Sequence, residues 1–164
     1  MQDITGGISV TKYERLMAEA EKRGLTVIEV DAGTDKNFGK NYDDLIVINS
    51  NMDTKSKACI LAEELGHCLK TCGNITDYSK TENYKKEQVA RRWSYEKLIG
   101  IVDLINAHKL GGCRNIYEIA DYIGVNEDIL ENALSYYNCK YPDGYRIDNY
   151  WINFNNGLEI YEMF

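Results

Sequence analysis

The spacing of hydrophobic residues changes along the first part of the chain, and these changes predict where helices and strands lie. Between residues 10 and 23 the apolar positions recur at helical spacing, and Gly24 follows as a stop signal. The β-branched run at residues 25–30 and the run LIVIN at residues 45–49 predict two strands, the second of them buried. Residues 31–44 are rich in turn formers, so we interpret them as a polar loop.

A long helix is predicted next. Asp53 or Thr54 can serve as its N-cap, and we expect the helix to run to about Cys72, with Gly73-Asn74 as its C-terminal cap. One side of this helix is an apolar stripe, which we assign to the core: Leu61, Leu65, Cys68, Leu69 and Cys72.

The same helix carries a candidate metal site on another side. Glu63 and His67 are four residues apart, so they project together, and Glu64 lies about 100° further round the helix. Residues at this spacing can converge on one ion, and the residue after the first ligand can accept a proton from metal-bound water. The stretch EELGH differs by one letter from H-E-x-x-H, which holds zinc and the general base in many metallopeptidases.

A catalytic metal needs a third ligand, and a second predicted helix at residues 83–100 supplies a candidate. Glu87 lies 20 residues beyond His67 on this helix. Ala90 and Ser94 lie on nearly the same side as Glu87, and such small residues allow two helices to approach closely. A glutamate on a following helix completes the His₂Glu class of zinc sites. We therefore predict Glu63, His67 and Glu87 as the metal ligands.

Simpler interpretations exist for each of these features. An isolated E-x-x-x-H pair is common by chance, and a solvated pair of carboxylates beside a partly buried His67 is the alternative. His108, the other histidine, stands at a predicted helix end, and we interpret it as structural or exposed. Cys68 and Cys72 could join His67 in a soft metal cluster, but their place on the apolar stripe favours small buried hydrophobes.

The segment 115–137 has the pattern of a helix-turn-helix, with a turn at Gly124-Val125. It contains no lysine or arginine but five acidic residues: Glu118, Asp121, Glu127, Asp128 and Glu131. A phosphate backbone would repel such a surface, so we favour a helical hairpin packed on the core over a DNA-binding regulator.

Aromatic and polar residues alternate near the C-terminus around Asn155-Asn156-Gly157, which predicts a β-hairpin. The expected fold class is therefore α+β, mostly helical. It has a pair of helices as in zincins, a small N-terminal sheet, a helical hairpin and a C-terminal β-hairpin. We expect a metallopeptidase-like core at residues 1–110, the helical hairpin at 111–141 and the β-hairpin at 142–164, in one compact unit.

Composition narrows the setting. The net charge of −7 gives no nucleic-acid footprint over the whole chain. Five cysteines without a C-x-x-C pair favour reduced thiols, and the polar residues 1–7 do not resemble a signal peptide. No apolar run approaches the roughly 20 residues that span a bilayer. We expect a cytoplasmic protein with no membrane contact.

Two stretches, ILAEELGHCL and KKEQVARRWSYEKLI, resemble the ImmA/IrrE family of metallopeptidases. The usual family pattern is L-A-H-E-L-G-H, followed by E-x-x-A-x-x-F/W-A on the next helix. The positions that match are Leu61, Ala62, Glu64, Leu65, Gly66, His67, Glu87, Ala90 and Trp93. The resemblance covers most of the chain, from the first predicted helix to about Tyr141.

This resemblance implies a metal-dependent endopeptidase in which Glu64 is the general base and His67 and Glu87 bind Zn²⁺. Members of the family are often carried by prophages and integrative elements, where they act on a neighbouring helix-turn-helix repressor and relieve repression. The implied partner is therefore a protein substrate of this repressor type, and no nucleic acid is expected.

Glu63 is a departure, because the family pattern has histidine there. The form E-E-L-G-H also resembles phage-type members, and a glutamate can bind zinc at about 2.0–2.2 Å. Two carboxylates and one imidazole make a harder, more anionic site, which could favour Mn²⁺ or Fe²⁺. A catalytically inactive module on the same fold, which binds its partner as an anti-repressor or inhibitor, is the alternative function.

The acidic segment 115–137 leads to a first prediction. The purified protein should show no salt-sensitive affinity for duplex DNA, because this segment offers no basic side chain to the phosphates. Fluorescence anisotropy with a labelled duplex at two salt concentrations measures this. Tight binding that weakens steeply with salt would revive the DNA-binding regulator.

Overall fold

The computed structural model describes residues 10–70 and 80–164. Its helices are α1 (Lys12–Lys22), α2 (Thr54–Lys70), α3 (Lys80–Leu98), α4 (Ile101–Lys109), α5 (Ile116–Ile123) and α6 (Glu127–Lys140). Its strands are β1 (Thr26–Val30), β2 (Gly39–Tyr42), β3 (Leu45–Asn49), β4 (Tyr145–Ile147), β5 (Tyr150–Asn153) and β6 (Glu159–Glu162). The predicted α+β, mostly helical fold class is confirmed.

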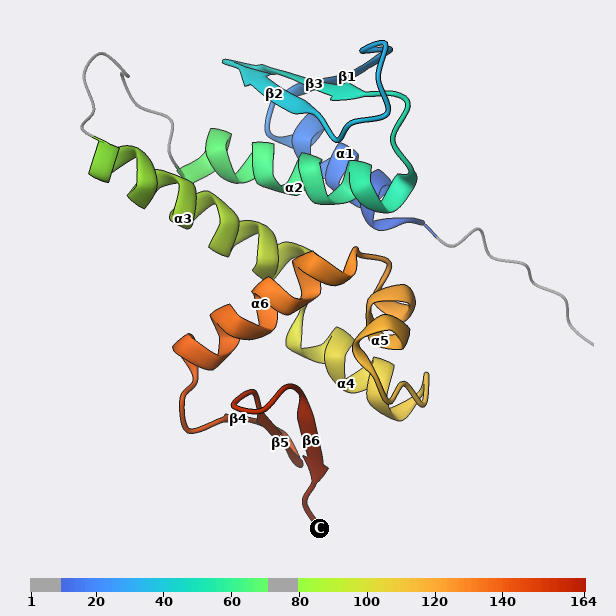
Figure 1. Ribbon diagram of the computed structural model, residues 1–164, viewed down its shortest axis with the longest axis vertical. Coiled ribbons are helices and arrows are strands. Elements are labelled where there is room, and N and C mark those ends of the chain that lie inside the picture. Colours follow the sequence, from blue (N-terminus) through green and yellow to red (C-terminus); the bar gives the residue numbers. More distant parts are fainter. Residues whose placement is uncertain (1–9, 71–79) are drawn as a thin grey trace, which may run out of the picture.

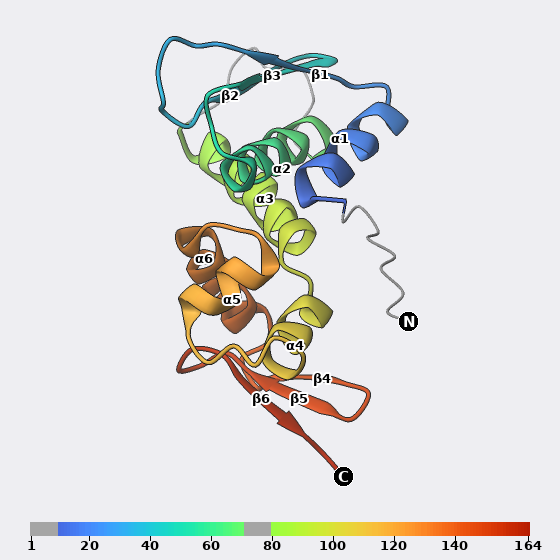
Figure 2. The same ribbon diagram turned by 90° about the vertical axis from the view of Figure 1, so that its right-hand side faces the viewer.

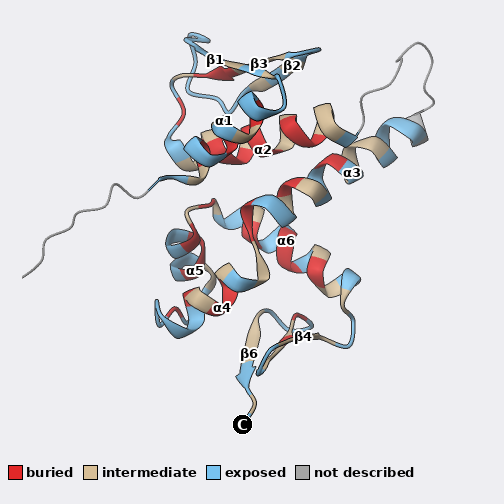
Figure 3. Ribbon diagram, turned by 180° about the vertical axis from the view of Figure 1, so that it is seen from behind, coloured by how far each residue is buried: buried red, intermediate tan, exposed pale blue. Residues whose placement is uncertain are grey.

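The molecule is elongated, with a small sheet at each end and the helices between them (Figures 1 and 2). The sheet of β1, β2 and β3 covers one end, and α1 and α2 lie beneath it. Helix α3 runs from α2 toward α6, and the sheet of β4, β5 and β6 closes the opposite end. Buried residues run along α2, α3 and α6 (Figure 3). The division of the chain at residues 110 and 141 stays a prediction.

The N-terminal sheet has the order β1-β3-β2, with β1 parallel and β2 antiparallel to β3. The two predicted strands are confirmed as β1 and β3. On β3, Ile46 and Ile48 are fully buried, whereas Leu45 and Val47 are half-buried, so this strand is buried mainly on one face.

The interpretation of residues 31–44 as a loop throughout was wrong, because β2 lies within them. Its sequence, GKNY, contains two residues that strands disfavour. The strand forms because its backbone pairs with β3 across a tight turn, where Asp43 has a left-handed φ of 54°. Local propensity carries no information about such a partner.

The rest of that segment is organised by one buried side chain. The Asn49 amide donates to the backbone oxygens of Thr34 and Lys36, at 2.7 and 3.0 Å. Its side-chain oxygen accepts from the backbone N–H groups of Ala32 and Asn51. Because its hydrogen-bonding groups are satisfied, Asn49 can be completely buried while it fixes the path into β2.

Helix α2 begins as predicted. Of the two candidates, Asp53 is the cap: its carboxylate accepts from the Ser56 backbone N–H at 3.0 Å and from the Ser56 hydroxyl at 2.6 Å. On the predicted stripe, Leu61 and Leu65 are fully buried, while Cys68 and Leu69 are half-buried. The other predicted member, Cys72, and the predicted cap Gly73-Asn74 lie outside the described residues.

Helices α2 and α3 are in backbone contact at Gly66. A Cβ atom built on Gly66 would lie 2.6 Å from the carbonyl oxygen of Ala90 and 3.1 Å from its Cα atom. Ala90 and Ser94 are buried at this contact side of α3. The expectation that small residues permit a close approach of the two helices is confirmed.

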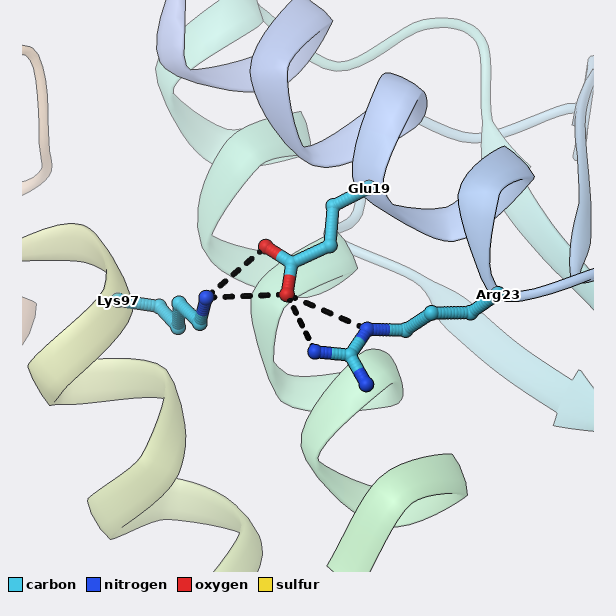
Figure 4. A network of polar contacts seen from close by, with 3 residues as sticks. All are labelled: Glu19, Arg23 and Lys97. Carbon is cyan, nitrogen blue, oxygen red and sulfur yellow. Dashed lines mark hydrogen bonds and ion pairs between the residues drawn. The ribbon is translucent and has the colours of Figure 1, made fainter.

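Helix α1 is tied to α3 through Glu19 (Figure 4). Lys97 of α3 donates to both carboxylate oxygens of Glu19, at 2.9 and 3.0 Å, and Arg23, the C-cap of α1, donates at 2.9 Å. Burial opposes the charge of Glu19, but the two cations outweigh it and hold its pKa below the ordinary value. Ion pairs near the surface contribute little each, so this network mainly orients α1.

The C-terminal half contains the predicted helical hairpin as α5 and α6. It joins the segment just after α3 through Tyr137, whose hydroxyl donates to the Ile99 carbonyl at 2.6 Å in the core. The predicted hairpin around Asn155-Asn156-Gly157 is confirmed as β5 and β6, and β4 adds a third antiparallel strand. His108 is exposed in the last turn of α4, as one of our two interpretations expected.

The helix contact gives a second prediction. Gly66→Ala should destabilise the protein by about 1–3 kcal/mol, because the new methyl group meets backbone atoms and the helices must move apart. At an unobstructed helix position the same change would stabilise by about 1 kcal/mol. The sign of the change in the free energy of unfolding, measured with urea, therefore decides whether the contact exists. Lys70→Ala, an exposed change on α2, is the control.

Candidate metal centre

Three predicted ligands converge where α2 faces α3. Glu63, His67 and Glu87 each place one ligand atom so that all lie within 4.8 Å of one another. The imidazole Nε2 of His67 is 3.3 Å from Oε2 of Glu87. The convergence expected from the sequence is confirmed, and the roles of these residues as ligands stay a prediction.

The helix contact explains why they meet. Glu63 and His67 lie one turn apart on α2, and Gly66 lies between them in sequence. Because Gly66 touches the backbone of Ala90, three residues beyond Glu87, the middle of α3 lies against α2. The glutamate on α3 therefore reaches a pair of side chains that α2 already holds together.

Arg91 is a fourth member that the sequence reasoning missed. Its Nε atom is 2.8 Å from Oε1 of Glu87 and 3.3 Å from Oε1 of Glu63. The signal in the sequence was its position four residues after Glu87 on the same helix. The guanidinium reduces the repulsion between two carboxylates that would otherwise face each other.

The surroundings of Glu63 and Glu64 disfavour the charged form of both carboxylates. Burial raises the pKa of Glu63; Arg91 opposes this shift, and the nearby Glu87 adds to it. Burial also raises the pKa of Glu64, which the charge of His67 opposes in part. A divalent cation would offset the unfavourable burial of these charges.

Glu64 lies under the outer edge of strand β2. The backbone N–H of Asn41 faces this carboxylate and favours its charged form. The backbone N–H of Asn49 in β3 donates to the carbonyl of Phe38. In an antiparallel pair, successive residues of a strand point their N–H groups alternately toward and away from the partner. The N–H of Asn41, three residues beyond Phe38, therefore points away from β3 toward the open edge. Strand and helix are in close contact here, because a Cβ on Gly39 would lie 2.2 Å from Ile60 Cγ2.

A cavity of about 290 Å³ adjoins the site between α2, α3 and the start of α6. Glu63 and Arg91 form part of its wall, together with Tyr95, Asp128 and Ile129. The cluster of Glu63, His67 and Glu87 therefore borders a hollow large enough for a side chain, and Glu64 beside it lies at the open strand edge.

The residues present fit a metal ion. Imidazole nitrogen and carboxylate oxygens are ligands for Zn²⁺, Mn²⁺ and Fe²⁺. Ligand atoms around a tetrahedral zinc at about 2.1 Å lie roughly 3.4 Å apart, so small side-chain rotations would bring the three groups onto one ion.

A family model described as the IrrE N-terminal-like domain, Peptidase M78, matches residues 20–135. The chain belongs to this family. The match spans well over half of the chain and includes α2 and α3 with the whole cluster. No curated protein and no solved structure matches the chain. Membership of the Peptidase M78 family indicates a protease and supports a metallopeptidase-type function.

One further finding concerns membranes. Among the residues that the structure describes, no helix combines the length and the apolar character needed to cross a bilayer.

The raised pKa of Glu64 gives a third prediction. The folded protein holds this proton more tightly than the unfolded chain, so the contribution of Glu64 to stability is full below the unfolded pKa. It is lost as the pH rises through the folded pKa. In metal-free protein, the free energy of unfolding of the wild type should therefore fall relative to Glu64→Gln as the pH rises from about 4 toward neutrality.

Urea unfolding of chelator-treated protein across this range measures the difference. Glu131→Gln, which removes an exposed carboxylate on α6, is the control and should give a nearly constant difference from wild type. A pH-independent difference for Glu64→Gln would contradict the buried, destabilised carboxylate.

Proposed function

We propose that this protein is a metal-dependent endopeptidase whose metal is held by Glu63, His67 and Glu87. The observation that carries the proposal is the convergence of these three side chains beside Glu64 in a member of the Peptidase M78 family. Zinc is the proposed metal, and manganese or iron are the alternatives that two carboxylate ligands suit.

Bound there, the metal would act as a Lewis acid toward the scissile carbonyl and the attacking water. Glu64 is the proposed general base. It takes a proton from the attacking water and passes it to the leaving amine. The raised pKa of Glu64 supports this role, because a carboxylate that returns a proton works best with a pKa nearer to the operating pH.

The open edge of β2 supports a peptide substrate. An extended chain can add to such an edge through backbone hydrogen bonds. A peptide paired there would lie close to Glu64, because Gly39 of this strand lies against the Glu64 side chain. The adjoining cavity beside Glu63 and Arg91 is placed to receive a substrate side chain.

The proposed substrate is a helix-turn-helix repressor of a mobile genetic element, cleaved in the cytoplasm to relieve repression. The support is the resemblance of the two motifs to phage-type ImmA/IrrE proteins. We keep a non-catalytic protein-binding module as the second candidate, because Glu63 replaces the usual histidine and Arg91 pairs with two of the three proposed ligands.

The fourth prediction separates these functions. Glu64→Gln should keep the bound metal but lower cleavage of a cognate repressor by about 10²–10⁴-fold, the usual contribution of a general base. His67→Ala should lose metal and cleavage together, because it removes a ligand. Elemental analysis after purification without chelator gives the metal content, and gel analysis of the co-expressed repressor gives cleavage.

Glu131→Gln, an exposed change on α6, is the matched control and should behave as wild type. If wild type and Glu64→Gln relieve repression equally and no fragment forms, the protein acts by binding. If Glu64→Gln itself loses the metal, Glu64 is a ligand and the proposed division of roles fails.

A further inference from the structure

Arg91 contacts one oxygen atom of each of two carboxylates, those of Glu63 and Glu87. Its Nε atom contacts Oε1 of Glu87 at 2.8 Å and Oε1 of Glu63 at 3.3 Å. The other oxygen of Glu87, Oε2, faces Nε2 of His67 at 3.3 Å. Each glutamate thus has one oxygen against the guanidinium, and Glu87 has its second oxygen on the side of the imidazole.

This division bears on how the carboxylates can bind a metal. A carboxylate whose second oxygen is held by an arginine offers the metal a single oxygen, whereas a free carboxylate can bind through both. Zinc prefers four ligands, and manganese prefers six, largely oxygen. A site limited to one oxygen from each glutamate, one imidazole nitrogen and water has the coordination that zinc favours.

The net charge of the proposed ligand set also points to a role for Arg91. The family pattern of two histidines and one glutamate gives a ligand set with one negative charge. With Glu63 in place of histidine the set carries two, and the cation of Arg91 brings the cluster back to one. Arg91 therefore compensates for the substitution that distinguishes this chain from the usual motif.

We infer that Arg91 is a positioning residue that keeps Glu63 and Glu87 as single-oxygen ligands and thereby preserves selectivity for zinc over manganese. The inference rests on the proposed function, since it needs the metal site to exist. Arg91 acts through the two glutamates and makes no contact with the metal itself.

The positive charge of Arg91 also repels any divalent cation, which complicates a measurement of affinity for one metal. Removing the charge would strengthen the binding of all divalent ions, even if the geometry of the site became worse. The ratio of zinc to manganese affinity is free of this effect to first order, because both ions carry the same charge. The ratio is therefore the quantity to measure.

The experiment determines the dissociation constants of Zn²⁺ and Mn²⁺ by competition with a chromogenic chelator, using purified full-length protein. Arg91→Ala should lower the preference for zinc by about tenfold, the smaller end of typical effects of residues behind metal ligands. Arg91→Lys should restore this only in part, since both contacts come from Nε and an ammonium on a flexible stem is not held at that position. Arg92→Ala, which removes the exposed neighbouring arginine, is the matched control and should leave the ratio unchanged.

A double-mutant cycle connects the effect to Glu63. In the Glu63→His background a single carboxylate remains for Arg91 to restrain. The fold-change that Arg91→Ala causes in the ratio of zinc to manganese affinity should therefore be about three times smaller than in the wild-type background. X-ray absorption of the zinc forms supplies an independent readout, with more oxygen neighbours in Arg91→Ala than in wild type.

The outcomes are distinguishable. If wild type binds neither metal, the proposed metal site fails and this inference fails with it. If wild type binds zinc but Arg91→Ala shifts both affinities equally, Arg91 acts through its charge alone and the inference is overturned while the metal site stands. Thermal melts of the metal-free variants show that each is folded, as expected for a half-exposed side chain.

Discussion

The backbone contact between α2 and α3 at Gly66 is the constraint on which the proposed centre depends. Any side chain at this position would force the helices apart, because a Cβ atom would meet the carbonyl oxygen of Ala90. A wider separation would withdraw Glu87 from the pair that α2 holds, Glu63 and His67. The glycine of the EELGH motif is therefore explained by packing, and the proposed chemistry follows from that packing.

The close contact has an electrostatic cost that neighbouring groups offset. It brings two half-buried glutamates together beside a third carboxylate, and burial raises the pKa of both Glu63 and Glu64. Arg91 contacts Glu63 and Glu87, and the backbone N–H of Asn41 in β2 faces Glu64. The cluster could hold a metal ion, and membership of the Peptidase M78 family indicates a protease.

The strand that the sequence concealed supplies the surface next to this chemistry. Buried Asn49 fixes the segment that leads into β2, and β2 then lies over Glu64 with one edge open. The scaffold therefore places a backbone edge, a proposed base and a ligand cluster side by side. These elements come from separate parts of the chain, and the sheet and the helix pair bring them together.

Helices α1, α2 and α3, strands β1 and β3, and the candidates Glu63, His67 and Glu87 could all be predicted from the sequence. These depend on local periodicity, capping and i, i+4 spacing, which are written into neighbouring residues. The fold alone reveals that β2 is a strand, that Asn49 organises its approach, and that Arg91 contacts Glu63 and Glu87. Each of these depends on a partner distant in the chain or on the rotation of one helix against another. Propensity and spacing carry no information about either.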